Sequence, residues 1–132
     1  NFEFHFEQLG EFDRPFATLI NDLAERGLMK HTLVVVLSEF GRTPKINKYY
    51  GRDHWGNAFS VALGGVGITP GAVFGATNKN GTAVTDGQVD AGHLFHTYLE
   101  ALGMNSRKSF KIGGQKVPVA DPAFEPIKEI LA

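Results

Sequence analysis

The chain has 132 residues, of which 42% are hydrophobic, 20% charged and 11% aromatic, a composition typical of a globular domain rather than a disordered or fibrous chain. A chain of this length can bury roughly two thirds of the surface that it exposes when unfolded, so it can form a core without cross-links. The absence of cysteine excludes disulfides, thiol nucleophiles and thiolate metal sites, and a net charge of −1 with scattered basic residues argues against nucleic-acid binding.

An amphipathic helix is predicted over residues 9–28, because apolar residues recur there at spacings of three and four. Gly27 is suited to end this helix, since glycine readily adopts the left-handed conformation of a C-terminal cap. The run 32–37, Thr-Leu-Val-Val-Val-Leu, has no polar alternation, which predicts a strand covered on both faces, as in a parallel sheet. A helix followed closely by such a strand indicates an α/β fold.

Residues 38–57 are predicted to form a long loop, because they combine glycines, a proline, charged residues and three aromatic residues. Loops of this length inside a compact domain are commonly functional. The rest of the chain is predicted to contain, in order, strands at 58–63 and 72–77, a helix at 89–102, a two-stranded ribbon at 110–119 and a short helix within 122–132.

This loop carries side chains suited to bind a metal ion and an anion. Glu39 follows the valine-rich strand at its carboxyl end, where ligands bind in open α/β sheets. Its carboxylate can hold a divalent cation, and His54, fifteen residues later, can supply an imidazole nitrogen to the same ion. Asp53 can be a further ligand or can orient His54. Arg42 and Arg52 carry planar guanidinium groups suited to the oxygens of a phosphate or sulfate ester.

A structural role for the same residues stays open at this point. Glu39 can cap a turn, the two arginines can pair with Glu39 and Asp53, and His54 can be a hydrogen-bonded residue beside Trp55. Two separated ligands are a weak signal for a metal site.

The helix predicted at 89–102 offers a second, weaker candidate. His93, His96 and Glu100 can share one helix face and bind zinc. The hydrophobic residues around them define a packed side, however, which predicts that the two histidines lie on its polar border.

Several segments, taken in order, resemble a known family. They are Asp22–Leu28, Thr32–Val36, Glu39–Pro44 (Glu-Phe-Gly-Arg-Thr-Pro), Ile46-Asn47, Gly51–Trp55 (Gly-Arg-Asp-His-Trp), Gly71 and Gly75–Thr77. They resemble the C-terminal part of the family named domain of unknown function 1501, a sulfatase-like family of the alkaline phosphatase superfamily. The resemblance implies that residues 1–132 are a single partial domain of an α/β sandwich with a mixed, mainly parallel sheet.

The resemblance also implies an activity. Metal-dependent members of the superfamily hydrolyse phosphate or sulfate esters with one or two cations and a Ser, Thr or modified Cys nucleophile, and zinc, calcium or manganese is the expected metal. By resemblance, Glu39 falls where these enzymes place an Asp ligand, and His54 falls where they place a late His ligand. Phe40 departs from the pattern, because a phenyl ring replaces the usual His. The nucleophile region is expected to precede this chain, so residues 1–132 alone are not expected to be active.

Two other hypotheses belong to different functional classes. In one, the chain is a non-catalytic binding module whose loop aromatics, Tyr49, Tyr50 and Trp55, contact a carbohydrate or a protein. In the other, the chain is a folding piece that self-associates through exposed apolar surface. The expected ligand is thus a small sulfate or phosphate ester or a carbohydrate, with no nucleic acid. No membrane span is expected, since no apolar stretch approaches the ~20 residues of a membrane helix. Only the family resemblance bears on location, and it implies export, as to a periplasm.

Overall fold

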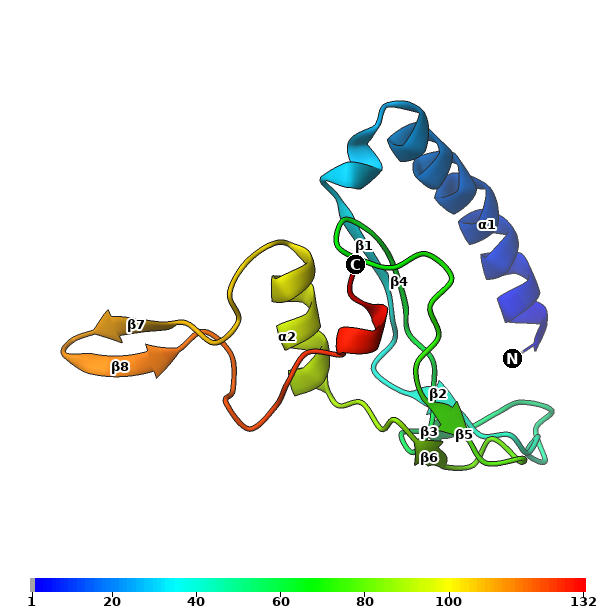
Figure 1. Ribbon diagram of the computed structural model, residues 1–132. Helices are drawn as coiled ribbons and strands as arrows, with labels where there is room; N and C mark the ends of the chain where they lie inside the picture. Colours follow the sequence, from blue (N-terminus) through cyan, green and yellow to red (C-terminus); the bar gives the residue numbers. More distant parts are fainter. Residues whose placement is uncertain (1) are drawn as a thin grey trace.

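The computed structural model describes residues 2–132, which form helices and four separate two-stranded sheets (Figure 1). Helix α1 spans Phe2–Glu25 and helix α2 spans Ala91–Ala101. The 3-10 helices are η1 (Leu28–Lys30) and η2 (Lys128–Ile130). The strands are β1 (Leu33–Val36), β2 (Gly41–Arg42), β3 (His54–Trp55), β4 (Ala62–Gly65), β5 (Ala76–Thr77), β6 (Val84–Asp86), β7 (Ser109–Ile112) and β8 (Gln115–Pro118). The α/β class predicted from the sequence is confirmed.

The strand direction differs from the expectation. Strand β1 pairs with β4 in antiparallel register, with Leu33 opposite Gly65 and Val36 opposite Ala62, and the other three pairs within residues 2–132 are antiparallel too. Parallel neighbours need a crossover connection, usually a helix. The segment between β1 and β4 contains only the short strands β2 and β3, so the chain turns back and pairs antiparallel.

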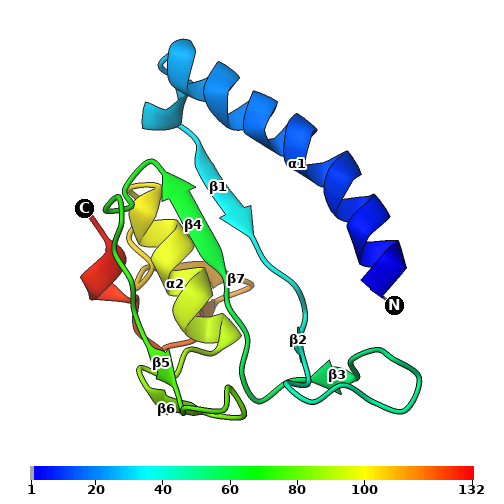
Figure 2. The ribbon, with the colours of Figure 1, turned by 90° about the vertical axis from the view of Figure 1, so that its right-hand side faces the viewer.

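Helix α1 is longer than predicted, and it ends where the sequence indicated. Gly27 adopts φ 70°, the left-handed conformation expected of it, and η1 follows directly. Helix α1 has no buried residue, and hydrophobic side chains such as Phe6, 86% exposed, and Leu9, 61% exposed, face solvent. Figures 1 and 2 show the helix at one edge of the molecule, apart from α2. Self-association through exposed apolar surface requires hydrophobic side chains that face solvent, as these do, and it stays a prediction.

The core lies where α2, the turn after β4 and the C-terminal tail meet. The tail is tied to the turn by backbone hydrogen bonds from Thr69 N to Ile130 O, 2.9 Å, and from Ala132 N to Gly67 O, 3.0 Å. It is tied to α2 by the bond from Ile127 N to Thr97 Oγ1, 2.9 Å. The buried hydrophobic residues are Ala58, Ile68, Leu99, Ala101, Ala120 and Ile127.

The later elements match the sequence prediction unevenly. Strands β7 and β8 form the predicted ribbon, joined by Gly113 and Gly114 at φ 55° and 84°, and the ribbon projects from the body (Figure 1). Strands β4 and β5 begin four residues later than predicted, and β6, which pairs with β5, was not predicted. Among the helices of residues 2–132, none combines the length and the apolar character that a membrane crossing requires.

Candidate functional site

Strands β2 and β3 bring together the two segments of the loop that carry the candidate ligands. Their register places Gly41 opposite Trp55 and Arg42 opposite His54, so residues 38–57 contain a short antiparallel ladder where the sequence predicted only a loop. A Cβ atom at Gly41 would lie 2.7 Å from the Ala58 carbonyl oxygen, which explains why glycine occupies this position. The neighbours of Gly41 in sequence, Phe40 and Arg42, are thereby held beside β3.

The imidazole of His54 packs against the ring of Phe40 in a tilted arrangement. The two ring centroids lie 4.0 Å apart, with an angle of 31° between the planes, and the guanidinium carbon of Arg42 lies 5.8 Å from the Phe40 centroid. Phe40 cannot coordinate a cation, but its ring fixes one face of the imidazole. His54 is exposed, and within residues 2–132 no hydrogen bond engages its ring nitrogens, so both are free to meet a ligand.

Arg52 and Asp53 are used mainly to hold the loop together. Nη1 of Arg52 donates to the carbonyl oxygens of Thr43, 2.7 Å, and Pro44. Oδ1 of Asp53 accepts a hydrogen bond from Nδ2 of Asn47, 2.7 Å. Their predicted roles as anion clamp and metal ligand stay predictions, but each side chain already has a structural role. Arg42 is bound less tightly, since its one hydrogen bond to a carbonyl is 3.4 Å long.

Glu39 lies at the bend after β1 and is exposed. It is one of the residues that line a hollow of about 1,560 Å³ reaching from β4 to the start of α2, whereas Arg42 and His54 do not line it. Within residues 2–132, no group of three or more His, Asp and Glu residues is placed to hold a metal ion. The structure therefore brings the Glu39 and His54 segments together without assembling a complete set of ligands.

A second polar cluster lies at α2, where His96 and Ser106 are each only 1% exposed. Nδ1 of His96 lies 2.7 Å from the Ser106 hydroxyl, and Nε2 lies 2.9 Å from the carbonyl oxygen of Asp121. The hydroxyl and the backbone N–H of Ser106 both donate to Oε1 of Glu100, at 2.8 and 3.0 Å. The prediction that both histidines lie on a polar border is wrong for His96, because these partners satisfy its polar atoms inside the core.

This cluster is structural. The Ser106 hydroxyl and the Asp121 carbonyl occupy the two ring nitrogens of His96, so neither nitrogen is free to bind zinc. The arrangement is also not a catalytic triad, because the carboxylate bonds to the serine rather than to the histidine. The hydrogen bonds from Ser106, first the backbone and then the hydroxyl, lower the pKa of Glu100 below its ordinary 4.5.

Sequence reasoning missed Ser106 and Asp121, because nothing in their local pattern indicates a partner on α2. His93, the other histidine of the helix, also has a structural role. Its Nδ1 accepts a hydrogen bond from the backbone N–H of Asp90, 3.0 Å, and closes the first turn of α2.

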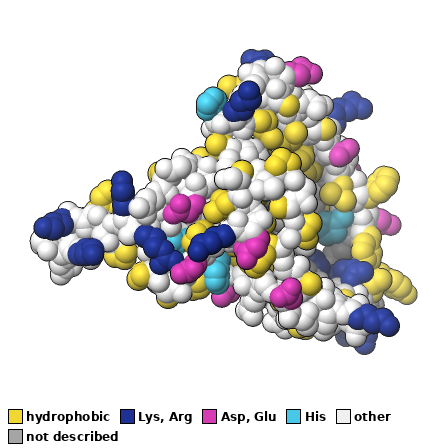
Figure 3. Space-filling view, viewed as in Figure 1, with side chains coloured by type: hydrophobic (Ala, Val, Ile, Leu, Met, Phe, Trp, Pro, Cys, Tyr) yellow, Lys and Arg dark blue, Asp and Glu magenta, His cyan; other side chains and the backbone are white. Residues whose placement is uncertain are grey.

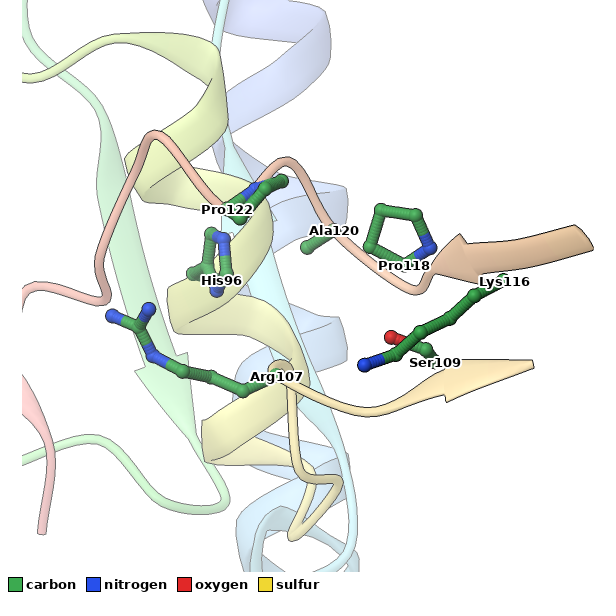
Figure 4. Close-up of a pocket in the computed structure, with 7 residues that line it drawn as sticks. All are labelled: His96, Arg107, Ser109, Lys116, Pro118, Ala120 and Pro122. Carbon is green, nitrogen blue, oxygen red and sulfur yellow. The ribbon is translucent and has the colours of Figure 1, made fainter.

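A small hollow of about 370 Å³ opens beside His96 at the base of the β7–β8 ribbon (Figure 4). Two cationic side chains line it, but the Arg107 guanidinium and the Lys116 ammonium lie well apart in Figure 4. Arg107 is also paired with Glu125 through Nη2 and Oε1, 2.8 Å apart. These features give no single clamp for an anion.

The fold and the candidate site define an α/β protein that carries acidic, imidazole and guanidinium side chains on and beside two short paired strands. The model of one family, described as protein of unknown function (DUF1501), matches residues 2–131. The chain belongs to this family, as its sequence segments predicted. Comparisons with curated proteins and with solved structures gave no match.

Proposed function

We propose that this chain contributes part of the active site of a metal-dependent hydrolase of phosphate or sulfate esters. Glu39 and His54 bind a divalent cation, zinc, calcium or manganese, and Asp53 serves as a further ligand or orients His54. Arg42, assisted by Arg52, binds the oxygens of the ester group. The observation that carries the proposal is the β2–β3 register, which places Arg42 opposite His54. Arg42 follows Glu39 by three residues in the sequence.

The residues fit a cation in part. A carboxylate and an imidazole are ligands that zinc and manganese accept, and both side chains are exposed. Asp53 has one oxygen engaged by Asn47 and can offer the other. Three ligands leave a metal coordination position open, as catalytic sites require. A bound cation would polarise the ester oxygen as a Lewis acid, and the sulfatase-like resemblance supports this chemistry. The nucleophile is not assigned to this chain, which alone is expected to be inactive.

Metal titration of the chain tests the proposal. Zn²⁺ or Mn²⁺ is titrated into the wild type and into the variants Glu39→Gln and His54→Gln by calorimetry, while NMR follows the imidazole resonances of His54. Each variant is expected to bind the ion at least tenfold more weakly, the scale on which losing a site residue acts. His31→Gln, an exposed histidine outside the loop, is the matched control. Wild-type affinity in both site variants would overturn the proposal.

A second candidate is non-catalytic binding of a carbohydrate or a protein through the aromatic residues of the same loop. Tyr49 and Tyr50 are 75% and 82% exposed, which favours this function. Trp55 does not join them, because it is half-buried and its indole N–H donates to the Thr82 carbonyl, 3.2 Å. Metal-dependent turnover of aryl sulfates and phosphate esters by the protein that carries this chain would decide for the hydrolase over the binding module.

A further inference from the structure

The end of the β2–β3 loop presents two aromatic and two cationic side chains to solvent. We name Lys45, Lys48, Tyr49 and Tyr50 the tyrosine tip. Tyr49 and Tyr50 are among the most exposed large hydrophobic residues of the described chain, and both lysines are exposed. Figures 1 and 2 show the loop projecting from the body of the molecule, beyond β3. Its side chains are therefore accessible to a large ligand.

The loop that carries the tip is held in one conformation by its own hydrogen bonds. The side-chain oxygen of Asn47 accepts from the backbone N–H groups of Tyr49, 2.9 Å, and Gly51, 3.2 Å. The backbone N–H of Asn47 donates to the Gly51 carbonyl, 2.8 Å. Together with the bonds that Arg52 makes across the base of the loop, these contacts order the tip before any ligand arrives, which lowers the entropy cost of binding.

The backbone of Tyr50 is strained. Its φ is 57°, and it is the one non-glycine residue with positive φ in residues 2–132. Bulky residues rarely adopt this conformation, whereas glycine adopts it without cost. Because the side chain is 82% exposed, packing does not compensate for the strain. Folding alone therefore does not explain a tyrosine here, and strain of this kind is found at functional sites.

The tip is also cationic, in a chain whose net charge is −1. The stretch from Phe40 to Arg52 contains four basic residues and no acidic residue. The Lys48 ammonium lies 5.0 Å from the centroid of the Tyr49 ring, so a positive charge and an aromatic face occupy adjacent positions. Figure 3 shows dark blue and yellow side chains together at the lower right, where this loop lies in Figure 1.

We propose that the tyrosine tip is a docking site for an anionic polysaccharide. The tyrosine rings pack against the C–H faces of the sugar rings, because the aromatic face is apolar and electron-rich. Lys45 and Lys48 pair with carboxylate or sulfate groups of the same chain. A nucleic acid fits less well, since its phosphates require a broad basic surface and this loop offers four basic residues in a chain whose net charge is −1. This inference rests on the second candidate function, binding through the loop aromatics, and not on the metal site.

Calorimetric titration of the full chain with polysaccharides tests the inference. Polygalacturonate and dextran sulfate supply the carboxylate and the sulfate group, and neutral dextran and a single-stranded oligonucleotide are the competing ligand classes. At least one of the anionic polymers is expected to bind, with affinity that falls as salt rises. Tyr49→Ala and the pair Lys45→Gln, Lys48→Gln should each weaken that binding at least tenfold. The pair Lys111→Gln, Lys116→Gln removes the same charge from the β7–β8 ribbon and should change the affinity less than twofold.

The variant Tyr50→Gly is expected to change ligand binding and folding stability in opposite directions. Glycine relieves the positive φ, so this variant should unfold at a higher denaturant concentration while it binds the anionic polymer at least fivefold more weakly. The inference would be overturned if the ribbon control Lys111→Gln, Lys116→Gln lost as much affinity as the tip variants. It would also be overturned if the oligonucleotide bound more tightly than the anionic polysaccharides and this binding depended on the tip residues. If neutral dextran bound the tip as tightly as the anionic polysaccharides, the specificity for anionic chains would be overturned, and carbohydrate binding would remain as the function. No binding of any polysaccharide would overturn the inference and the carbohydrate form of the second candidate function together.

Discussion

Replacing Ser106 by alanine tests the buried cluster at α2. The hydroxyl of Ser106 joins His96 to Glu100 through contacts of 2.7 and 2.8 Å, and both His96 and Ser106 are 1% exposed. Its removal leaves Nδ1 of His96 buried without a hydrogen-bond partner, at a cost of about 1–3 kcal/mol, and deletes one hydrogen bond to a carboxylate. We expect the free energy of unfolding to fall by about 2–3 kcal/mol in total.

Urea and thermal unfolding of the full chain measure this change. For 132 residues, a loss of 2–3 kcal/mol corresponds to a decrease in Tm of roughly 6–15 °C. Ser60→Ala replaces an exposed serine and should change the free energy of unfolding by less than about 0.5 kcal/mol. A loss in Ser106→Ala no larger than in this control would refute the role assigned to the hydroxyl.

The stability lost in Ser106→Ala is also expected to depend on pH, which the formation of a cavity alone would not cause. The two hydrogen bonds from Ser106 lower the pKa of Glu100 below 4.5 in the folded chain. A lowered folded-state pKa stabilises the protein above the unfolded value, and this stabilisation is lost as pH falls from 4.5 through the lowered pKa. Ser106→Ala keeps the backbone bond and loses the hydroxyl's contribution. The difference in stability between wild type and variant should therefore narrow below pH 4.5, and a constant difference would contradict this account.

Three further substitutions probe the loop and the core. Asn47→Ala deletes the side-chain bonds that order the tyrosine tip and should cost about 1–2 kcal/mol, with faster amide hydrogen exchange in the loop than in the wild type. Gly67→Ala places a Cβ against the Ala101 carbonyl at φ 68° and should lower the Tm by more than Gly103→Ala, whose Cβ meets no atom at a similar φ. Thr97→Val leaves Ile127 N–H without its buried acceptor and should cost about 1–3 kcal/mol, seen as faster exchange of that amide.

Elements with local signals could be predicted from the sequence. Gly27 ends α1 as its permissive backbone indicated, and the paired glycines between β7 and β8 mark a hairpin turn. The direction of β1 could not be predicted, because an apolar run does not give the orientation of the partner strand. The run also predicted a strand covered on both faces, whereas three residues of β1 are half-buried and Val36 is exposed. Strands β2 and β3 have two residues each, too few to show any alternation.

The packed face of α2 shows where hydrophobic patterns mislead. Phe95 is one of the hydrophobic residues that define the packed side predicted for this helix, yet it is 48% exposed, while His96 and Thr97 are buried. Two hydrogen bonds satisfy the buried hydroxyl of Thr97: it donates to the His93 carbonyl, 2.7 Å, and accepts from Ile127 N–H. A polar residue can be buried when distant segments supply its partners, and a single sequence does not reveal those partners.

The candidate site was predicted from the specific segments around Glu39 and His54, and the strands β2 and β3 within these segments pair in the structure. The same segments supply the bonds that build the loop, so one set of residues serves two purposes. Arg52 closes the base of the loop, and the ring of Phe40 holds His54 where a ligand can reach it. Metal binding and polysaccharide docking would then share one rigid element, with the cation at its base and the sugar chain at its tip. Loosening the base by Arg52→Ala would weaken both, whereas substitutions at the tip would weaken only the second.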